Sequence, residues 1–377
     1  MGRSTLLTFI RWVLPVFVFS TLAALAQSTF EPLIQSVVGV GAEGEGNEGA
    51  ASAVKQLSAA GPAALLPILQ ASGKGSPVAD NWLRVIANVI VDRARTAQGA
   101  LPLEELKGFL RDTRNGEPGR VLAFDLLMQA DAQTARSLED GLLHDPVQVL
   151  RRGAVAKLIS AASAAESTHA KKLWMEALSA VRDEDQTKTV VSQLKKFGVE
   201  VDVPAHFGFL RQWSVIGPFD NAERKGFDAI FPPEKEIDLG KTYAGKGKSV
   251  NWQPLDSGDE YGKIDLNKPL TALKEATAYA HTSLEVPEDR DVELRLGCKN
   301  AWKVWLNGVL LFSRDEYHRG QKMDQYKLKC RLKRGANAIL VKCCQNEQTE
   351  SWTVEWEFQL RVCDSAGTGL KFEKSKP

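Results

Sequence analysis

The sequence predicts a multidomain α + β protein, in which an all-α region precedes an antiparallel β-sandwich. From about residue 50 to 198, apolar residues recur with the 3.6-residue period of amphipathic helices. Beyond residue 207 the period changes to 2, which is typical of antiparallel strands with one buried and one solvated face. A length of 377 residues exceeds one ordinary domain and leaves room for both regions.

Composition and net charge indicate which classes of binding partner to expect. The chain is 44% hydrophobic and 25% charged, as in soluble globular proteins, and its formal net charge is +1. Nucleic-acid binding requires clustered positive charge, and neither half of the chain carries an excess of it. DNA and RNA are therefore not expected partners.

Residues 1–26 predict a signal peptide. Arg3 and Arg11 flank an uncharged, mostly apolar run that ends in Ala24-Leu25-Ala26, a small-x-small cleavage pattern. The run is shorter than the roughly 20 residues that span a bilayer. We expect export to the periplasm or the extracellular space, with membrane attachment only through an uncleaved N-terminal segment. Residues 27–49, acidic and glycine-rich, predict a flexible linker.

Residues 50–198 predict an alanine-rich helical domain. Ser76-Pro77 has the pattern of an N-cap followed by proline at the first helical position, and Asp145-Pro146 repeats it. Gly198 follows lysines at the end of the last helix, as a C-terminal cap does. The domain boundary is expected between Gly198 and His206. A closed helical bundle remains an alternative to stacked helix pairs.

The segment from Asp145 to Ala154 reads D-P-x-x-x-x-R-x-x-A and resembles HEAT-type repeats. In that family, repeated helix pairs share a core and offer an extended surface to partners. The resemblance implies scaffolding and protein contact rather than chemistry.

Residues 207–366 predict the β-sandwich, and residues 367–377 a disordered tail. Asn307-Gly308 between two apolar runs predicts a hairpin with a type I′ turn, which needs positive φ at both residues. A late strand with alternating apolar residues is expected to bury Trp352, Val354, Trp356, Phe358, Leu360 and Val362.

Three motifs of this region are similar to galactose-binding-like jelly rolls: Trp213 to Asn221, the V-W-L-N-G hairpin at Val304 to Gly308, and L-x-x-G-x-N-x-I-x-V from Leu332 to Val341. Such modules bind sugars, bind proteins or brace neighbouring domains. The whole chain resembles uncharacterised exported bacterial proteins that join helical repeats to this module. The likeness to galactose-binding-like modules implies carbohydrate binding or protein–protein interaction, whereas the likeness of the whole chain to those exported proteins implies no known activity.

The sequence contains no catalytic constellation. It lacks a nucleophile motif and its five histidines are scattered. The carboxylates from Asp256 to Asp265 share one polar loop with nothing to desolvate them and raise a pKa. We therefore expect no enzyme, no catalytic residue, no bound cofactor and no metal site apart from a structural calcium that this loop, or Asp220 and Asn221, could hold. The odd count of five cysteines leaves at least one thiol unpaired in a monomer.

The long polar loop from Ser313 to Gln325 is the best candidate for binding, since long loops on a rigid sandwich commonly carry function. A sugar needs an aromatic face for its C–H side and planar polar groups for its hydroxyls. We predict an exported protein that binds a glycan or an exported partner. The alternatives are a structural scaffold without small ligand and, third, a polysaccharide hydrolase. The expected ligand-binding residues are Trp302, Tyr317, His318, Asp324, Gln325, Asn346 and Glu347.

Overall fold

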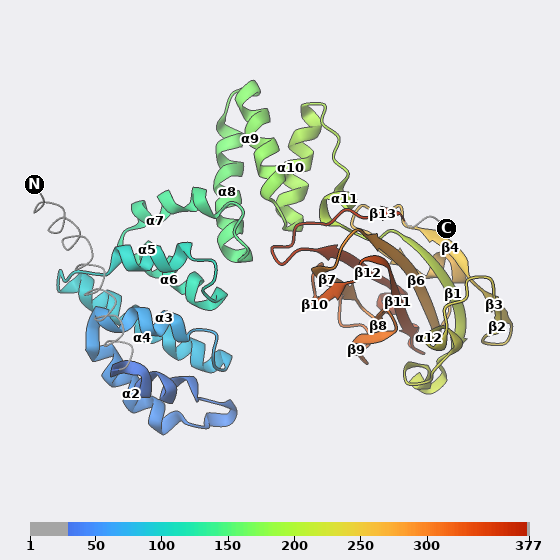
Figure 1. Cartoon of the computed structure of the whole chain (residues 1–377), viewed down its shortest axis with the longest axis horizontal. Coiled ribbons are helices and arrows are strands. Elements are labelled where there is room, and N and C mark those ends of the chain that lie inside the picture. Colours follow the sequence, from blue (N-terminus) through green and yellow to red (C-terminus); the bar gives the residue numbers. More distant parts are fainter. Residues whose placement is uncertain (1–28, 375–377) are drawn as a thin grey trace, which may run out of the picture. The chain divides into compact units, whose positions relative to one another are not determined.

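The computed structural model of the protein describes residues 29–374 (Figure 1). The predicted signal peptide and the last three residues lie outside this range. The chain divides into two compact units, and the division falls between Lys157 and Leu158. In the part of the first unit that the structure describes, residues 29–157, all regular elements are helices, and the second unit joins further helices to antiparallel sheets, which confirms the predicted α + β class.

The first unit is a succession of helices that pack on one another. Residues 29–38 are helical. The elements that follow are η1 (Ala42–Gly44), α2 (Asn47–Ala60), η2 (Gly61–Ala64), α3 (Leu65–Ala71), α4 (Pro77–Thr96), α5 (Leu103–Arg111), α6 (Glu117–Ala130), α7 (Ala132–Leu138) and η3 (Glu139–Leu142), and α8 (Gln148–Ala164) crosses the division between the units.

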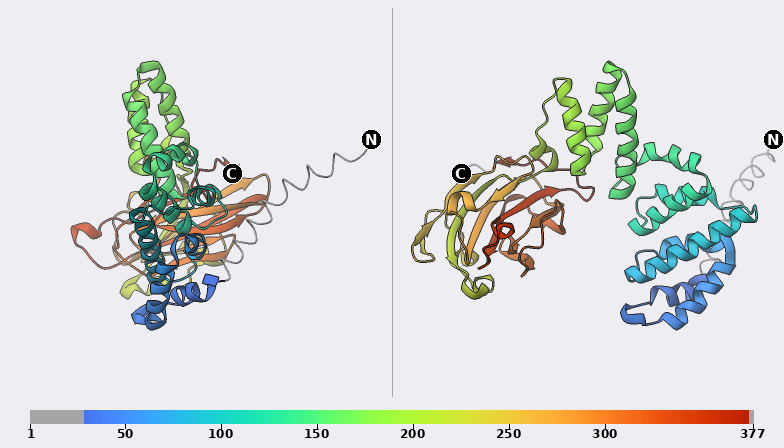
Figure 2. Two further views of the ribbon diagram at one scale, coloured as in Figure 1. Left: turned by 90° about the vertical axis from the view of Figure 1, so that its left-hand side faces the viewer. Right: turned by 180° about the vertical axis from the view of Figure 1, so that it is seen from behind.

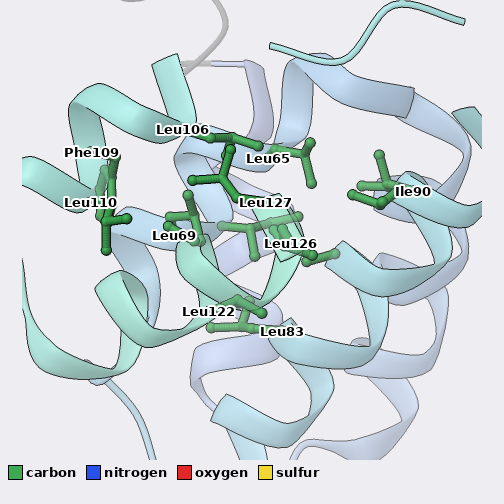
Figure 3. Packing of buried hydrophobic residues seen from close by; sticks show 14 of the residues in the cluster. Leu65, Leu69, Leu83, Ile90, Leu106, Phe109, Leu110, Leu122, Leu126 and Leu127 are labelled. Carbon is green, nitrogen blue, oxygen red and sulfur yellow. The ribbon is translucent and has the colours of Figure 1, made fainter. Parts of the chain in front are cut away.

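Leucine-rich faces of these helices form one hydrophobic core (Figure 3). Leu83 of α4 and Leu122 of α6 are almost fully buried in it, together with Leu110 of α5. The Ser76 side chain accepts a hydrogen bond from the Ala79 amide, which confirms the predicted cap of α4. The 3.6-residue period predicted for this region therefore corresponds to helices that share one core.

A buried ion pair stands at the start of α8. Arg120 donates to Asp145 through both terminal nitrogens, and the two side chains are 1% and 4% exposed. Asp145 also accepts from the Val147 amide at 2.8 Å. The helix begins at Gln148, later than the start at Pro146 that the predicted N-cap at Asp145 implied.

The residues expected to form a flexible linker are structured. Val40 and Ala50 are buried against Ala79, and Trp82 packs on the same cluster. This apolar contact orders the glycine-rich stretch, which its acidic composition did not reveal. The flexible-linker prediction is therefore wrong for residues 29–49.

The second unit begins with helices that pack together before the first strand. They are α9 (Ser167–Ala180), α10 (Glu184–Lys196) and α11 (Val203–Phe207), and Figure 2 shows α9 and α10 side by side. Gly198, at φ +70°, follows α10 as predicted. His206 contacts the Val181 carbonyl at 3.0 Å, and Arg182 donates to Thr368. Through such contacts residues 158–197 belong to the same compact unit as the strands, although the change from helix to strand comes after residue 207.

Two antiparallel sheets pack face to face in this unit. The order in the larger sheet is β4-β1-β6-β11-β8-β9, with β13 also on β6, and in the smaller β10-β7-β12-β5. Apolar side chains of both sheets share one core. The strands are β1 (Gln212–Asp220), β2 (Thr242–Ala244), β3 (Ser249–Asn251), β4 (Gln253–Asp256), β5 (Lys263–Asp265), β6 (Ala276–Val286), β7 (Arg290–Cys298), β8 (Ala301–Leu306), β9 (Val309–Arg314), β10 (Tyr326–Leu332), β11 (Gly335–Gln345), β12 (Glu357–Cys363) and β13 (Glu373–Lys374), with short helices η4 (Ala222–Phe227), α12 (Pro232–Lys235), α13 (Asn267–Leu270) and η5 (Ser351–Thr353) between them.

The predicted hairpin is confirmed. Asn307 and Gly308 both have positive φ, at +51° and +78°, and Leu306 pairs with Val309 across the turn. The late strand is shorter than predicted, because β12 begins only at Glu357. Trp352 and Val354 lie outside it and are 56% and 50% exposed, so their predicted burial is wrong.

A lysine is buried on the outer face of the larger sheet. Lys342 of β11 is 0% exposed, and its ammonium donates to the Phe227 and Ala229 carbonyls at 2.9 and 2.7 Å and to Glu234 at 2.9 Å. Tyr279 donates to the same carboxylate. These bonds hold the connection after β1 against the sheet.

The C-terminal stretch expected to be disordered is ordered as far as residue 374. Gly367 accepts from Arg361 at 3.0 Å, and Leu370 and Phe372 pack against the sandwich core. The backbone of β13 then pairs with β6. Between residues 29 and 374, no helix combines the length and apolar character needed to cross a membrane.

Candidate functional site

Three connections meet at one end of the sandwich. They are the η4 turn after β1, the first part of the loop after β9, and the β11–β12 connection. Side chains from the three contact one another directly, as described below. We call this group the rim cluster; it comprises Asn221, Arg224, Tyr317, His318, Asn346, Glu347 and Trp352.

The loop from Ser313 to Gln325 divides into two parts with different surroundings. Tyr317 and His318 belong to the rim cluster. Further on, Met323 packs in the cluster around Phe207, over the outer face of the smaller sheet. The second part is thus a covering segment of the fold, which the loop's polar composition did not distinguish from an exposed one.

Asp324 lies in that covering segment and pairs with two buried arginines. Its carboxylate accepts from Arg361 Nε and Nη2, each at 2.6 Å, and from Arg295 Nη1 at 2.7 Å. Burial raises the pKa of Asp324, but the hydrogen bonds and charges of the two guanidinium groups outweigh it, so its pKa is lowered. With its oxygens occupied in this way, Asp324 is an internal ion-pair partner rather than a sugar-binding group.

Two more of the predicted residues have internal roles. Gln325 accepts from the Cys298 amide at 3.3 Å and donates to the Gly320 carbonyl at 3.2 Å. Trp302 is 1% exposed and its ring lies in the sandwich core beside Phe312. The expectation that Trp302 offers a stacking face is corrected, because its position on β8 points the ring between the sheets.

The Tyr317 ring is enclosed by other residues and does not offer an open face for stacking. Asn221 donates its side-chain amide to Tyr317 Oη at 3.2 Å, and the Arg224 guanidinium lies 5.2 Å from the ring centre. The ring also packs on Phe227 and Cys344. Burial raises the pKa of Tyr317, so the phenol keeps its proton at neutral pH.

His318 and Asn346 form the polar centre of the cluster. His318 has φ +58°, and its Nε2 lies 2.9 Å from Asn346 Oδ1, which also accepts from the Gln348 amide at 3.3 Å. Because this amide oxygen can only accept, Nε2 is the donor in this hydrogen bond. Nδ1 is buried with no hydrogen-bond partner, and Asn346 is 0% exposed. The hydrogen bond to Asn346 therefore fixes the orientation of the imidazole ring.

Arg224 and Glu347 form an ion pair at the solvent-exposed side of the rim cluster. The guanidinium donates to both carboxylate oxygens, at 3.1 and 2.5 Å. The hydrogen bonds from Arg224 lower the pKa of Glu347 to about 2. Both side chains are nearly half exposed, so the pair can offer planar donors and acceptors to a ligand.

Trp352 is the aromatic residue that the sequence analysis missed. It lies 5.4 Å from the His318 ring, perpendicular to it, and is 56% exposed. The next residue, Thr353, is tied to the same connection: its hydroxyl lies 2.9 Å from the Gln348 carbonyl oxygen and 2.8 Å from that of Glu350, and the Thr353 carbonyl accepts from the Gln345 side chain. The polar run from Asn346 to Ser351 was the available signal that the strand starts later.

Two of the carboxylates considered for catalysis or calcium accept hydrogen bonds from backbone amides in turns. Asp259 accepts from the amides of Tyr261 and Lys263 at 2.8 and 3.2 Å, and Asp265 accepts from the Asn267 amide at 3.0 Å. Across residues 29–374, no three His, Cys, Asp or Glu side chains are grouped as a metal would require.

Three cavities lie away from the rim cluster, and none of its residues lines them. One of about 450 Å³ is bounded by α11, β6 and the C-terminal stretch. Another of about 510 Å³ lies between α9 and the same stretch, and a third of about 590 Å³ lies beside β10.

Comparison with known proteins yields no family. No family model and no curated protein sequence matches the chain. Among solved structures, a β-glucosidase from Kluyveromyces marxianus matches in its selenomethionine form (17% identity, 24% of this chain, 11% of that chain, TM-score 0.19) and in complex with glucose (19%, 24%, 10%, TM-score 0.19). The GH31 α-xylosidase from Xanthomonas citri matches at 10% identity over 41% of this chain and 16% of that chain, with a TM-score of 0.21. At these TM-scores the likeness carries no argument about fold or activity, and the chain spans only a small part of each enzyme.

Proposed function

We propose that this is an exported, non-catalytic binding protein whose β-sandwich recognises a glycan at the rim cluster. The observation that carries the proposal is the exposed Trp352 ring beside the fixed polar groups of His318 and Asn346. An exposed tryptophan costs solvation free energy unless something covers it, and aromatic residues commonly anchor binding surfaces.

The chemistry of a sugar ring fits this arrangement. One side of the ring presents C–H groups, which pack on an aromatic face, and its edge presents hydroxyls, which need planar donors and acceptors. Trp352 supplies the face. Glu347 and Arg224, nearly half exposed, supply a carboxylate and a guanidinium at the edge.

The two-unit architecture supports a binding role with a second partner. The motifs at Trp213, Val304 and Leu332 liken the sandwich to galactose-binding-like modules, and the Asp145 motif likens the helices to HEAT-type repeats. Stacked helices of that kind bury a continuous core and offer a surface to other proteins. The helical unit would thus dock an exported protein, while the sandwich holds the glycan.

Export rests on the N-terminal pattern of two arginines, an apolar run and Ala24-Leu25-Ala26. Expression in a bacterial host, followed by fractionation and N-terminal sequencing, tests this part. Recovery of a chain that begins at Gln27 in the periplasm or medium supports it, and an uncut cytoplasmic chain contradicts it.

The binding proposal is tested by glycan screening of the full mature chain. Trp352→Ala should lower the affinity for the glycan at least tenfold, which is about 1.4 kcal/mol of binding free energy, because the stacking face is lost. Val354→Ala is the matched control, because Val354 is also half exposed and lies two residues away. Failure of the native chain to bind any glycan, or equal affinity in both variants, would refute the proposal.

A structural scaffold without small ligand is the competing function. It predicts that the chain binds no glycan and that a specific partner is captured through the helical unit even when Trp352 is replaced. A polysaccharide hydrolase predicts turnover that one carboxylate substitution abolishes. Affinity capture and turnover assays on the same preparation separate the three.

A further inference from the structure

Two cysteines meet across the interior of the β-sandwich. Cys298 ends β7 in the smaller sheet, and Cys343 lies on β11 in the larger one. Their side chains point into the shared core, where they are 3% and 1% exposed. The two sulfur atoms lie 3.8 Å apart, although the residues are 45 positions apart in the sequence. The contact therefore joins the two sheets.

The other three cysteines have different surroundings. Cys344 points to the opposite side of β11, where its sulfur lies 3.4 Å from Thr277 Oγ1. Cys363 contacts the Glu293 carbonyl on the outer side of the smaller sheet, and Cys330 lies on edge strand β10. Among the five thiols, all within the range that the structure describes, Cys298 and Cys343 make the one sulfur–sulfur contact.

We propose that Cys298 and Cys343 are a modification site at which an intersheet disulfide forms. A disulfide brings the sulfurs to about 2.0 Å, so each sulfur needs to move by less than about 1 Å along their line. Both are held on strands of a packed core, which keeps them opposed. The inference is independent of the proposed glycan site.

The step consumes an oxidant of the disulfide class, such as oxidised glutathione. One cysteine thiolate attacks the oxidant's S–S bond and forms a mixed disulfide while one oxidant thiol leaves. The second cysteine then attacks the protein sulfur of that intermediate, and the other oxidant thiol leaves. The protein loses two protons and two electrons, and the oxidant is reduced to two thiols.

The burial of the two thiols determines when thiol–disulfide exchange can occur. Burial raises the pKa of the Cys343 thiol, so little thiolate exists in the closed sandwich. Exchange is therefore expected while the chain folds or when the sheets separate. Once formed, the bond is shielded from reductants by the same core, including Trp356, whose indole donates to the Cys343 carbonyl.

The test is refolding of the full mature chain in a buffer of oxidised and reduced glutathione, followed by alkylation in denaturant and peptide mapping without reduction. We expect a Cys298–Cys343 cross-linked peptide lighter by about 2 Da than the two thiol peptides, with three alkylated cysteines. Five alkylated cysteines, or a different pair, would overturn the inference.

Two cysteine variants test the Cys298–Cys343 assignment further. Cys298→Ser should leave Cys343 alkylated and abolish the difference in thermal midpoint between oxidised and reduced protein. Cys363→Ser, the matched control, should keep the cross-link and that difference. Because the map of the native chain is decisive alone, a variant that fails to fold does not affect the outcome.

Discussion

The Asp324 network allows a quantitative test of how the smaller sheet is held to its covering loop. Asp324→Asn keeps the shape of the side chain but removes the charge that two buried arginines share. Arg361 is 0% exposed and Arg295 is 6% exposed at the side chain, so neither can turn to water without unfolding. Arg361 keeps its bonds to the Phe207 and Gly367 carbonyls, and Arg295 keeps Glu293.

The magnitude follows from the contacts that remain. Removing one partner of a buried pair costs about 3–5 kcal/mol, and the surviving bonds place Asp324→Asn near the lower end, at about 3 kcal/mol. For a unit of this size that corresponds to a fall of roughly 6–12 °C in thermal midpoint. The pKa of Asp324 is lowered in the fold, so this stabilisation is present above the pKa of an unfolded aspartate and is lost as the pH falls through the folded value.

The assay is urea denaturation followed by tryptophan fluorescence, with Asp228→Asn as control. Asp228 is also paired, with Lys303 at 3.4 Å, but its side chain is 89% exposed, so its loss should change the free energy of unfolding by less than about 0.5 kcal/mol. A loss below about 1 kcal/mol for Asp324→Asn would mean that the buried pair does not hold the loop.

Further predictions concern pH, packing and the rim cluster. His206 is partly buried, and desolvation lowers its pKa to about 4, so unfolding takes up a proton and the contribution of His206 to stability falls by about 2 kcal/mol from pH 8 to pH 5. His206→Gln should flatten that slope in denaturation at several pH values. Gly297→Ala should destabilise by about 1–3 kcal/mol, because its Cβ would lie 2.5 Å from the Lys322 carbonyl oxygen, whereas Gly108→Ala, in open space on α5, should be neutral or stabilising in the same thermal scan. Glu347→Gln breaks a half-exposed pair and should lower glycan affinity in titration calorimetry while shifting the thermal midpoint little; a large shift would assign Glu347 to the fold.

Sequence periodicity predicted the fold well where one face of an element is buried. The helical period from about residue 50 to 198, the Asn307-Gly308 hairpin and the alternation from Phe358 to Val362 are all found in the structure. Each depends on local spacing or turn chemistry, which a single sequence contains.

The candidate site was predicted less completely, because tertiary contacts decide it. Arg361 and Arg295 have the spacing of solvent-facing residues, and a period of 2 cannot show that another segment covers that face. Trp352 continues the apolar alternation of the late strand in the sequence. In the structure, Thr353 makes hydrogen bonds within the β11–β12 connection, and the Trp352 indole is exposed. Tyr317, His318, Asn346 and Glu347 do come together, because they lie in loops at the same end of the sandwich.

The buried Lys342 ammonium bears on how rigid the rim cluster is before a ligand binds. Its three donors are all engaged by the connection after β1, so lifting that connection would leave a cation in an apolar layer without partners. Arg224 is carried on the same connection, and its backbone is therefore anchored before any encounter. A ligand at this end should bind to a preorganised wall, with little conformational entropy lost on association.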